Sequence, residues 1–393
     1  MLDEFSPDEF PADEHRDRKP HERLLVHIEP AQARPAAIRS RLSAVIGQDT
    51  AKDYLSVLFS LHLARVLAGQ DQERGLPSAV LVGPTGVGKT HSMRSLSHQI
   101  GLPFVTVDCS TLVEAGIVGG QPEDIMEMLV GEAQTLLDST QSRPSQDDVR
   151  WLAGRGIVFF DEFDKLASPD GKEGGRGGSE RGRAVQRRLL TLLEGDLVAI
   201  GRKTVSWSEH YIHTANLLIL VGGAFAGIDS NEVRSKRRVA PKPAETEGAN
   251  AGGVTAEDIQ NYGFMPELVA RLPVIVPFTE LSTGHLEQIL RNDQVSPLKL
   301  WQDALAGLDI PFEVEDRVLP FLAKEAVRLR MGARALQQVV FPLLARKTVA
   351  ADIKGGAAVR LAVEDFRRES QLNPLEPLPE VQTEAQPDQP KES

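Results

Sequence analysis

The stretch that decides the fold is residues 83–90, which read Gly83-Pro84-Thr85-Gly86-Val87-Gly88-Lys89-Thr90. It follows an apolar run, Ala79–Val82, that is typical of a buried strand. A strand that ends in a glycine-rich turn and opens a helix points backbone N–H groups and the positive end of the helix dipole at one spot. Glycines let such a turn approach a phosphate closely. The pattern therefore predicts a nucleotide phosphate site, in which Lys89 reaches the β- and γ-phosphates and the Thr90 hydroxyl binds Mg²⁺.

A second motif reads Gly156-Ile157-Val158-Phe159-Phe160-Asp161-Glu162. Four consecutive apolar residues suit a strand buried on both faces of a parallel sheet, and two carboxylates follow at the end where such sheets bind ligands. We expect Asp161 to hold the Mg²⁺ shell and Glu162 to orient and polarise the attacking water. Together the two motifs predict that the chain binds a nucleoside triphosphate and hydrolyses it.

The composition narrows the class of protein. The chain has 393 residues, 41% of them hydrophobic, which is enough for two domains and a substantial core. The net charge of −12 argues against nucleic acid as the main substrate. The single cysteine, Cys109, excludes a disulfide within the chain and a cysteine-based zinc site. Because no apolar stretch approaches the ~18 residues of a membrane helix and no signal-peptide profile is present, we expect no membrane association and a cytoplasmic protein.

The pattern along the chain predicts an α/β fold with a parallel sheet and right-handed crossovers, followed by a smaller, mainly helical domain. Helical segments alternate with strand candidates at Ala79–Val82, Phe104–Asp108, Ile157–Phe160 and Leu217–Val221. We expect a flexible acidic arm over residues 1–35, a large domain over 36–280, a small domain over 281–368 and a disordered acidic tail over 369–393. Glycine-rich and charged compositions predict mobile stretches at 168–182 and 230–253.

Six further segments occur in order along the chain: Val45-Ile46-Gly47-Gln48; residues 108–119; residues 185–190 with 193–195; Gly222-Gly223-Ala224-Phe225; Pro266-Glu267-Leu268 with Arg271-Leu272-Pro273; and Gly332-Ala333-Arg334. With the two motifs above, they resemble the AAA+ superfamily, and more closely the ClpX/HslU unfoldases. The similarity covers about residues 38–363, most of the chain.

The resemblance implies a P-loop AAA+ large domain with a helical lid, ATP and Mg²⁺ as cofactors, and assembly of identical chains into a ring, most often a hexamer. It implies a binding site for ATP formed by Val45, Ile46, Gly83, Pro84, Thr85, Gly86, Val87, Gly88, Lys89, Thr90, Asp161 and Arg334, with Thr90 and Asp161 at the metal. Arg334 corresponds to the sensor-2 arginine of the same subunit, and Arg271 to the arginine finger that reaches a neighbour's nucleotide. Both would stabilise charge in the transition state, beside Glu162 as the catalytic carboxylate. At the sensor-1 position no Asn or Thr ends the run 217–221, so no residue is assigned there.

Two departures from the family pattern bear on function. The first pore loop reads Gly116-Ile117-Val118-Gly119, where the family carries Gly-Tyr-Val-Gly, so Ile117 and Val118 would grip a polypeptide with less apolar area than an aromatic ring supplies. The Ile-Gly-Phe tripeptide that docks a peptidase does not occur in 230–253, and the sequence ends in Gln-Pro-Lys-Glu-Ser rather than in apolar residues. A dedicated peptidase partner is therefore not supported by the sequence.

Three interpretations stay open beside an ATP-dependent unfoldase that threads protein substrates. The first, favoured equally, is a specialised ATPase that takes apart a particular protein complex without a peptidase. The second is a nucleic-acid motor or clamp-loader-like ATPase, against which the acidic balance counts. The third is a nucleotide-gated scaffold that barely turns over. Stimulation of the ATPase by unstructured protein favours a protein substrate, and stimulation by DNA favours the nucleic-acid motor.

Overall fold

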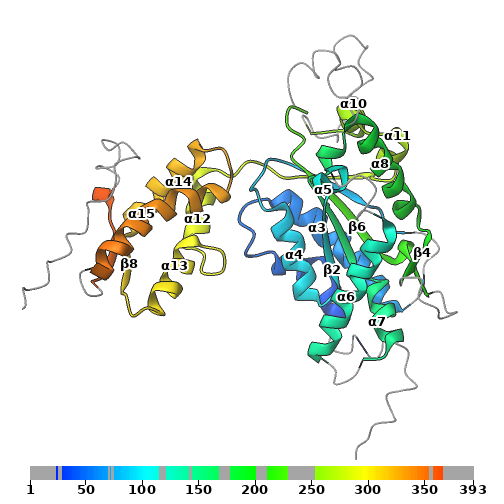
Figure 1. Ribbon diagram of the computed structural model, residues 1–393, viewed down its shortest axis with the longest axis horizontal. Coiled ribbons are helices and arrows are strands. Elements are labelled where there is room, and N and C mark those ends of the chain that lie inside the picture. Colours follow the sequence, from blue (N-terminus) through cyan, green and yellow to red (C-terminus); the bar gives the residue numbers. More distant parts are fainter. Residues whose placement is uncertain are drawn as a thin grey trace, which may run out of the picture.

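In the computed structural model of the chain, the structure describes residue 24 and residues 29–69, 71, 75–114, 121–140, 144–167, 178–200, 210–228, 253–353 and 357–365. Figure 1 shows a larger α/β part (blue to green) and a smaller, mainly helical part (yellow to orange). The helices of the larger part are α2 (Pro35–Arg41), α3 (Asp49–Ala68), α4 (Lys89–Ile100), α5 (Cys109–Glu114), α6 (Pro122–Thr140), α7 (Gln146–Ala153), α8 (Gly178–Glu194), α10 (Ala256–Gly263) and α11 (Pro266–Ala270).

A five-stranded parallel sheet forms the centre of the larger part, in the order β2-β3-β6-β1-β7. Its strands are β1 (Ala79–Val82), β2 (Phe104–Asp108), β3 (Ile157–Asp161), β6 (Leu218–Gly223) and β7 (Val274–Pro277). The order brings β1 and β3, which carry the two nucleotide motifs, to either side of β6, so that both motifs leave the same edge of the sheet. The predicted α/β fold with a parallel sheet is confirmed.

Burial explains why the central strands were visible as apolar runs. All four residues of β1 and the first four of β3 are buried, as expected for strands covered by helices on both faces. Helix α3 packs against β7, α4 against β2 and β3, and α6 against β2. In Figure 1, α3 and α4 lie on one side of the sheet and α6 and α7 on the other. This sandwich fixes the ends of β1 and β3 relative to each other.

The structure also contains elements that the sequence patterns did not indicate. Strand β7 has four residues, of which only Val276 is buried, and it ends in a proline at the edge of the sheet. An antiparallel pair, β4 (Leu197–Ile200) with β5 (His210–His213), extends the fold outside the central sheet. Helix α8 begins at Gly178, inside the stretch expected to be mobile, and a 3-10 helix, η1 (Pro30–Ala33), lies inside the expected N-terminal arm. Strands β4, β5 and β7 and the 3-10 helix η1 have four residues each, too few for a periodic pattern.

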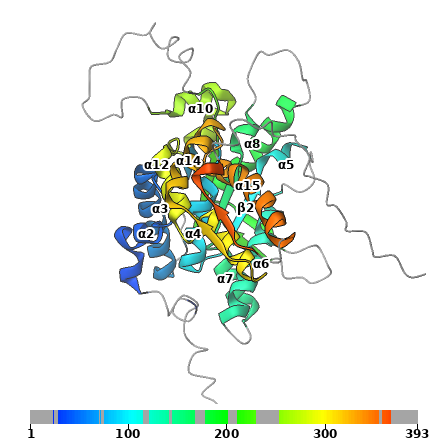
Figure 2. The ribbon, with the colours of Figure 1, turned by 90° about the vertical axis from the view of Figure 1, so that its left-hand side faces the viewer.

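The smaller part consists of α12 (Thr283–Arg291), α13 (Pro297–Ala306), α14 (Leu319–Arg328) and α15 (Arg334–Ile353), with a two-stranded parallel sheet of β8 (Phe312–Val314) and β9 (Val359–Leu361). Helix α14 packs between α12 and α15, and α15 contacts α13 and β9. In Figure 2 this part faces the viewer, in front of the larger part.

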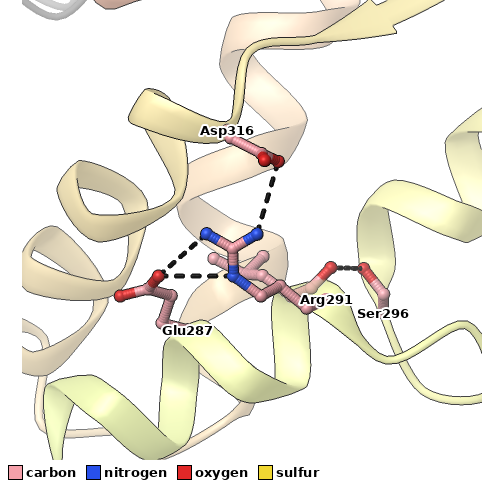
Figure 3. A network of polar contacts seen from close by, with 5 residues as sticks. Glu287, Arg291, Ser296 and Asp316 are labelled. Atoms are coloured by element: carbon pink, nitrogen blue, oxygen red, sulfur yellow. Dashed lines mark hydrogen bonds and ion pairs between the residues drawn. The ribbon is translucent and has the colours of Figure 1, made fainter.

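A polar network ties α12 to the turn before α14 (Figure 3). The Arg291 guanidinium donates to Glu287 one helical turn earlier and to Asp316 across the groove. The Ser296 hydroxyl donates to the Leu290 carbonyl at 2.6 Å and accepts from the Leu298 N–H, so it ends one helix and caps the next.

Among the described residues, no helix is both long and apolar enough to cross a membrane.

Candidate functional site

The phosphate-binding turn leaves β1 at Gly83 and enters α4 at Lys89. The Gly83 N–H donates to the Gly223 carbonyl at 3.3 Å, which anchors the start of the turn to β6. Gly88 has φ +103°, a conformation that side chains rarely adopt, and it precedes the first residue of α4. The turn and the free N-terminus of a twelve-residue helix therefore face the same side, as the sequence predicts for an anion site.

Lys89 is a buried cation inside this turn. Its side chain is 8% exposed, and Nζ donates to the carbonyls of Gly83 at 2.6 Å and Pro84 at 2.8 Å. Burial lowers the pKa of the Lys89 ammonium from its ordinary value, while Asp161 and Asp164 act in the opposite direction. Because two of its three N–H groups donate to carbonyls, the charge is tolerated in the protein interior, and it lies where negative charge on a ligand would be stabilised.

A hydrogen bond joins Thr90, in the first turn of α4, to Asp161, at the end of β3. The Thr90 hydroxyl donates to Oδ2 of Asp161 at 2.5 Å, and Oδ1 of Asp161 accepts the N–H of Glu162 at 2.9 Å. A hydroxyl and a carboxylate are oxygen ligands of the kind that Mg²⁺ binds, and Mg²⁺ in such sites takes its other ligands from phosphate and water. This donor set, together with the adjacent Lys89, fits magnesium and a nucleoside triphosphate.

Glu162 occupies an unusual backbone conformation directly after β3. Its φ is +52°, in the left-handed region, and its side chain is exposed. Such a conformation costs of order 1 kcal/mol in a residue other than glycine and persists where surrounding contacts hold it. Asp161 therefore accepts the Thr90 hydroxyl, while the Glu162 side chain is exposed to solvent at the end of the strand.

Asp164 is a further acidic residue, and it joins the end of β3 to the end of β6. Its Oδ1 accepts the N–H of Ala224 at 3.2 Å, which connects the segment after β3 to the end of β6. The Asp-Glu-Phe-Asp spacing in residues 161–164 was the only sequence signal for it. The sequence patterns assigned no residue at the end of β6, and the structure places the Ala224 backbone there, bonded to Asp164.

A cleft of about 630 Å³ gathers most of the predicted binding residues. Its size suits a nucleotide. Val45, which is buried, and Ile46, which is half-buried, both line it. The larger part lines it with Ala44, Val45, Ile46, Thr85, Gly86, Val87, Gly88, Lys89, Thr90, His91, Asp161, Glu162, Asp164, Lys165, Gly223 and Ala224, and the smaller part with Leu281, Ile289, Gln294, Val295, Ser296, Pro297, Leu300, Ala333, Arg334 and Gln337.

The smaller part touches the phosphate-binding turn directly. The Ala333 N–H donates to the Gly86 carbonyl at 2.9 Å. Gly86 (φ +77°) and Gly332 (φ +59°) face each other so closely that a Cβ on Gly86 would lie 2.1 Å from the Met331 carbonyl oxygen. Arg334 begins α15 immediately after this contact and lines the cleft, near enough for its charge to lower the pKa of Lys89 further. The close contact therefore requires glycine on both sides, at Gly86 and at Gly332.

Comparison with known proteins decides the family. A family model described as "AAA domain (Cdc48 subfamily)" matches residues 74–275, and one described as "C-terminal, D2-small domain, of ClpB protein" matches residues 281–361. The chain is 31% identical over 359 residues to the ATP-dependent Clp protease ATP-binding subunit ClpX of Porphyromonas gingivalis, covering 85% of this chain and 84% of the relative. It is 32% identical over 325 residues to the protein of the same name from Bacteroides thetaiotaomicron (78% and 74%), and 31% identical over 325 residues to that from Azotobacter vinelandii (76% and 69%).

The chain belongs to the ClpX family of AAA+ ATPases. The resemblance inferred from the sequence motifs is thereby confirmed, and the chain is an ATPase.

Arg271, assigned to the arginine-finger segment of the ClpX family, lies apart from this cleft. It follows α11, and its Nη2 is 3.4 Å from Oε1 of Glu194 at the end of α8. About half of its side chain is exposed, and it is not among the described residues that line the cleft. Arg334 is thus brought to the phosphate turn of its own chain, whereas Arg271 is not. The predicted action of Arg271 on a neighbouring chain stays a prediction.

The pore-loop residues of the ClpX pattern, Ile117 and Val118, lie outside the described residues. Residues that pattern-based reasoning missed come mainly from the smaller part, including Leu281, Ile289 and Val295. Their sequence signal is that of ordinary apolar core residues, so only the packing of the two parts reveals that they face the cleft.

Proposed function

We propose that this chain assembles into a ring, hexameric by resemblance, that uses ATP hydrolysis to unfold, thread or remodel protein substrates. A large domain over 36–280 and a small domain over 281–368 would move relative to each other. The observation that carries the proposal is the direct bond from Ala333 of the smaller part to the Gly86 carbonyl in the phosphate-binding turn. A ligand held by the turn would lie beside that contact, which supports a link between occupancy of the cleft and the position of the smaller part.

The roles proposed for the residues follow from their placement. ATP with Mg²⁺ supplies a phosphoanhydride bond with an activated γ-phosphoryl group. Lys89 and the N–H groups of residues 83–88 bind and orient phosphate oxygens, while Thr90 and Asp161 offer oxygen ligands to the metal ion. Glu162, exposed beside Asp161, orients a water molecule and accepts its proton. Arg334, at the start of α15, supplies positive charge from the smaller part.

The exposed position of Arg271 supports its assignment to a subunit interface. Its partner, Glu194, is itself 41% exposed, so their ion pair is weak and easily exchanged for a stronger anion. In a ring, Arg271 of one chain would reach the cleft of the next, which would make hydrolysis depend on assembly. This dependence is part of the proposed function.

A second candidate function is supported by the sequence of the pore loop and of residues 230–253. Isoleucine at position 117 and the lack of an Ile-Gly-Phe tripeptide favour an ATPase that separates one particular protein complex without a peptidase. The chemistry in the cleft is the same for both candidates. They differ in whether a generic folded protein is a substrate.

The test compares ATPase activity alone, with an unstructured protein and with DNA, and follows loss of fluorescence of a folded reporter that carries an unstructured tail. The proposed unfoldase shows stimulation by unstructured protein and an ATP-dependent loss of fluorescence, both abolished in Lys89→Ala. Stimulation without loss of the reporter favours the complex-disassembling candidate. Stimulation by DNA instead of protein contradicts both.

A further inference from the structure

Gln48 follows Val45 and Ile46, which resemble the adenine-packing segment of the ClpX family, and its side chain contacts the linker of residues 278–282 between β7 and α12. Its Nε2 donates to the Thr279 carbonyl at 2.7 Å, and its Oε1 accepts the Thr279 N–H at 2.9 Å. Two strand residues exchange the same pair of bonds, and a primary amide is a neutral side chain that offers both partners. Gln48 therefore holds the backbone of Thr279 as a neighbouring strand would.

The local structure around Gln48 is arranged for this contact rather than for its own helix. Gln48 has φ +61° and is 6% exposed, a strained backbone conformation for a buried residue other than glycine. It precedes α3, where a side chain commonly caps the helix, yet within the described part of the chain it makes no capping bond. Its Nε2 also lies 3.5 Å from the Val87 carbonyl in the phosphate-binding turn. One amide thus borders the turn, the segment of Val45 and Ile46, and the linker.

The linker is fixed up to Thr279, and the residue that caps α12, Ser282, follows only three residues later. The Phe278 N–H donates to the Val82 carbonyl at 2.7 Å, which continues the pairing of β7 with β1. Ser282 then caps α12 through the His285 N–H. Any rotation of the smaller part is consequently concentrated at residues 280–281, between a clamped residue and a capped helix.

Helix α12, which follows the linker, also contacts the segment 45–48. The ring of His285 lies against Gly47, where an added Cβ would come within 3.1 Å of two ring atoms. Gly47 and Gln48 therefore contact the chain both before residues 280–281, at Thr279, and after them, at His285 in α12. A displacement of the segment 45–48 would be passed to the linker from both ends.

We propose that Gln48 is a positioning residue that couples nucleotide binding to the angle of the smaller part, by clamping Thr279 beside the segment that contacts the base. This inference rests on the proposed function. With the clamp, a shift of the segment 45–48 on nucleotide binding moves the start of the linker. Without it, the cleft still contains Lys89, Thr90 and Asp161 and binds nucleotide, but the smaller part no longer follows.

The test replaces the amide by a thioether of similar length, Gln48→Met, in full-length assembled protein. The matched control is Gln186→Met, because Gln186 is also fully buried and its amide bridges backbone groups, Leu166 O and Met265 N, away from the linker. A second control is Thr279→Ala, which keeps both backbone bonds to Gln48.

The distance is measured between spin labels at Glu132→Cys on α6 and Lys324→Cys on α14, both exposed positions. Labelled chains are diluted into unlabelled ones, and all chains carry Glu162→Gln so that ATP is retained. Native Cys109 is buried, and burial raises the pKa of its thiol well above the ordinary value, so it does not compete for the label.

We expect the distance to differ between ADP and ATP in the background protein, in Gln186→Met and in Thr279→Ala, and the difference to be lost in Gln48→Met with ATP still bound. In enzyme with Glu162 intact, Gln48→Met should lower kcat more than it raises KM for ATP. An unchanged difference in Gln48→Met overturns the inference while leaving the proposed function intact. No difference in the background protein removes the proposed movement itself, and the inference with it.

Hydrogen exchange on the unmodified chain tests the same clamp if Gln48→Met does not fold. The Thr279 amide should be protected without nucleotide, and residues 45–48 and 279–282 should gain protection together when the non-hydrolysable analogue of ATP is added. Exchange of the Thr279 amide at an unprotected rate, or protection of one segment without the other, overturns the inference.

Discussion

At the end of β3 two adjacent carboxylates have different surroundings, and this difference separates their roles. Asp161 receives the Thr90 hydroxyl at 2.5 Å, whereas Glu162 is exposed with φ +52°. The partnered carboxylate suits a metal shell, and the exposed one suits water activation. Their order along the chain is not interchangeable, because only Glu162 occupies the left-handed conformation.

The first prediction concerns Glu162→Gln. The amide keeps the shape of the side chain and loses the proton acceptor, so we expect turnover to fall about 100-fold or more while ATP binding is retained. Single-turnover hydrolysis and equilibrium binding of ATP, measured on the same sample, check this. Hydrolysis at the normal rate would show that another group activates the water.

At the scale of the element, helix α3 is joined to the start of β3 by a buried histidine. His62 is 1% exposed, and its Nε2 is 2.9 Å from the Arg155 carbonyl. Burial lowers the pKa of His62 from 6.5 to about 4. The unfolded chain therefore binds a proton at His62 between these values and the folded chain does not, so stability is complete above pH 6.5 and declines as pH falls toward 4.

The second prediction follows from this linkage. His62→Gln removes the titrating group and keeps a hydrogen-bond donor near the Arg155 carbonyl. We expect the variant to lose less stability than the native chain between pH 6.5 and 4, by at most about 3 kcal/mol. Denaturant titrations at several pH values give the comparison. Parallel curves for the two proteins would contradict the assignment of a neutral buried imidazole.

The third prediction concerns the turn before α15. A Cβ at Gly332 would lie 2.5 Å from the Gly86 carbonyl oxygen, so Gly332→Ala should push the smaller part off the phosphate-binding turn and weaken ATP binding about tenfold, or ~1.4 kcal/mol. Gly227→Ala is the matched control: Gly227 has φ +82°, and an added Cβ meets nothing within 4 Å among the described residues. Both variants should lose similar thermal stability. Equal ATP affinity in the two would argue against the contact.

The elements that could be predicted from the sequence share one property, a local signal. Strands β1, β2 and β3 are apolar runs followed by turn or acidic residues, and the phosphate-binding turn is a contiguous motif. The contact of Gln48 with Thr279 spans 231 residues, and that of Gly86 with Ala333 is equally remote, so neither has a periodic or compositional trace. Strand β7 escaped notice because it is short, half-exposed and ends in proline at the sheet edge.

At the scale of the whole molecule, the cleft is assembled from two parts of one chain. In the proposed ring, a neighbouring chain is a third contributor. Arg334 lines the cleft of its own chain, while Arg271 lies at an exposed position beside Glu194. If hydrolysis requires both arginines, an isolated chain is an incomplete enzyme. Turnover per chain should then rise with protein concentration as the ring forms.

The central claim is that ATP bound at Lys89 is hydrolysed with the help of Arg271 from the adjacent chain, and mixing two inactive variants measures this most directly. The Arg271→Ala variant keeps an intact cleft. The Lys89→Ala variant keeps Arg271 but cannot bind the phosphates. We expect each alone to lack turnover, and an equal mixture to regain activity in about a quarter of its clefts, those of Arg271→Ala chains beside Lys89→Ala chains. A mixture that forms rings and stays inactive would contradict the claim.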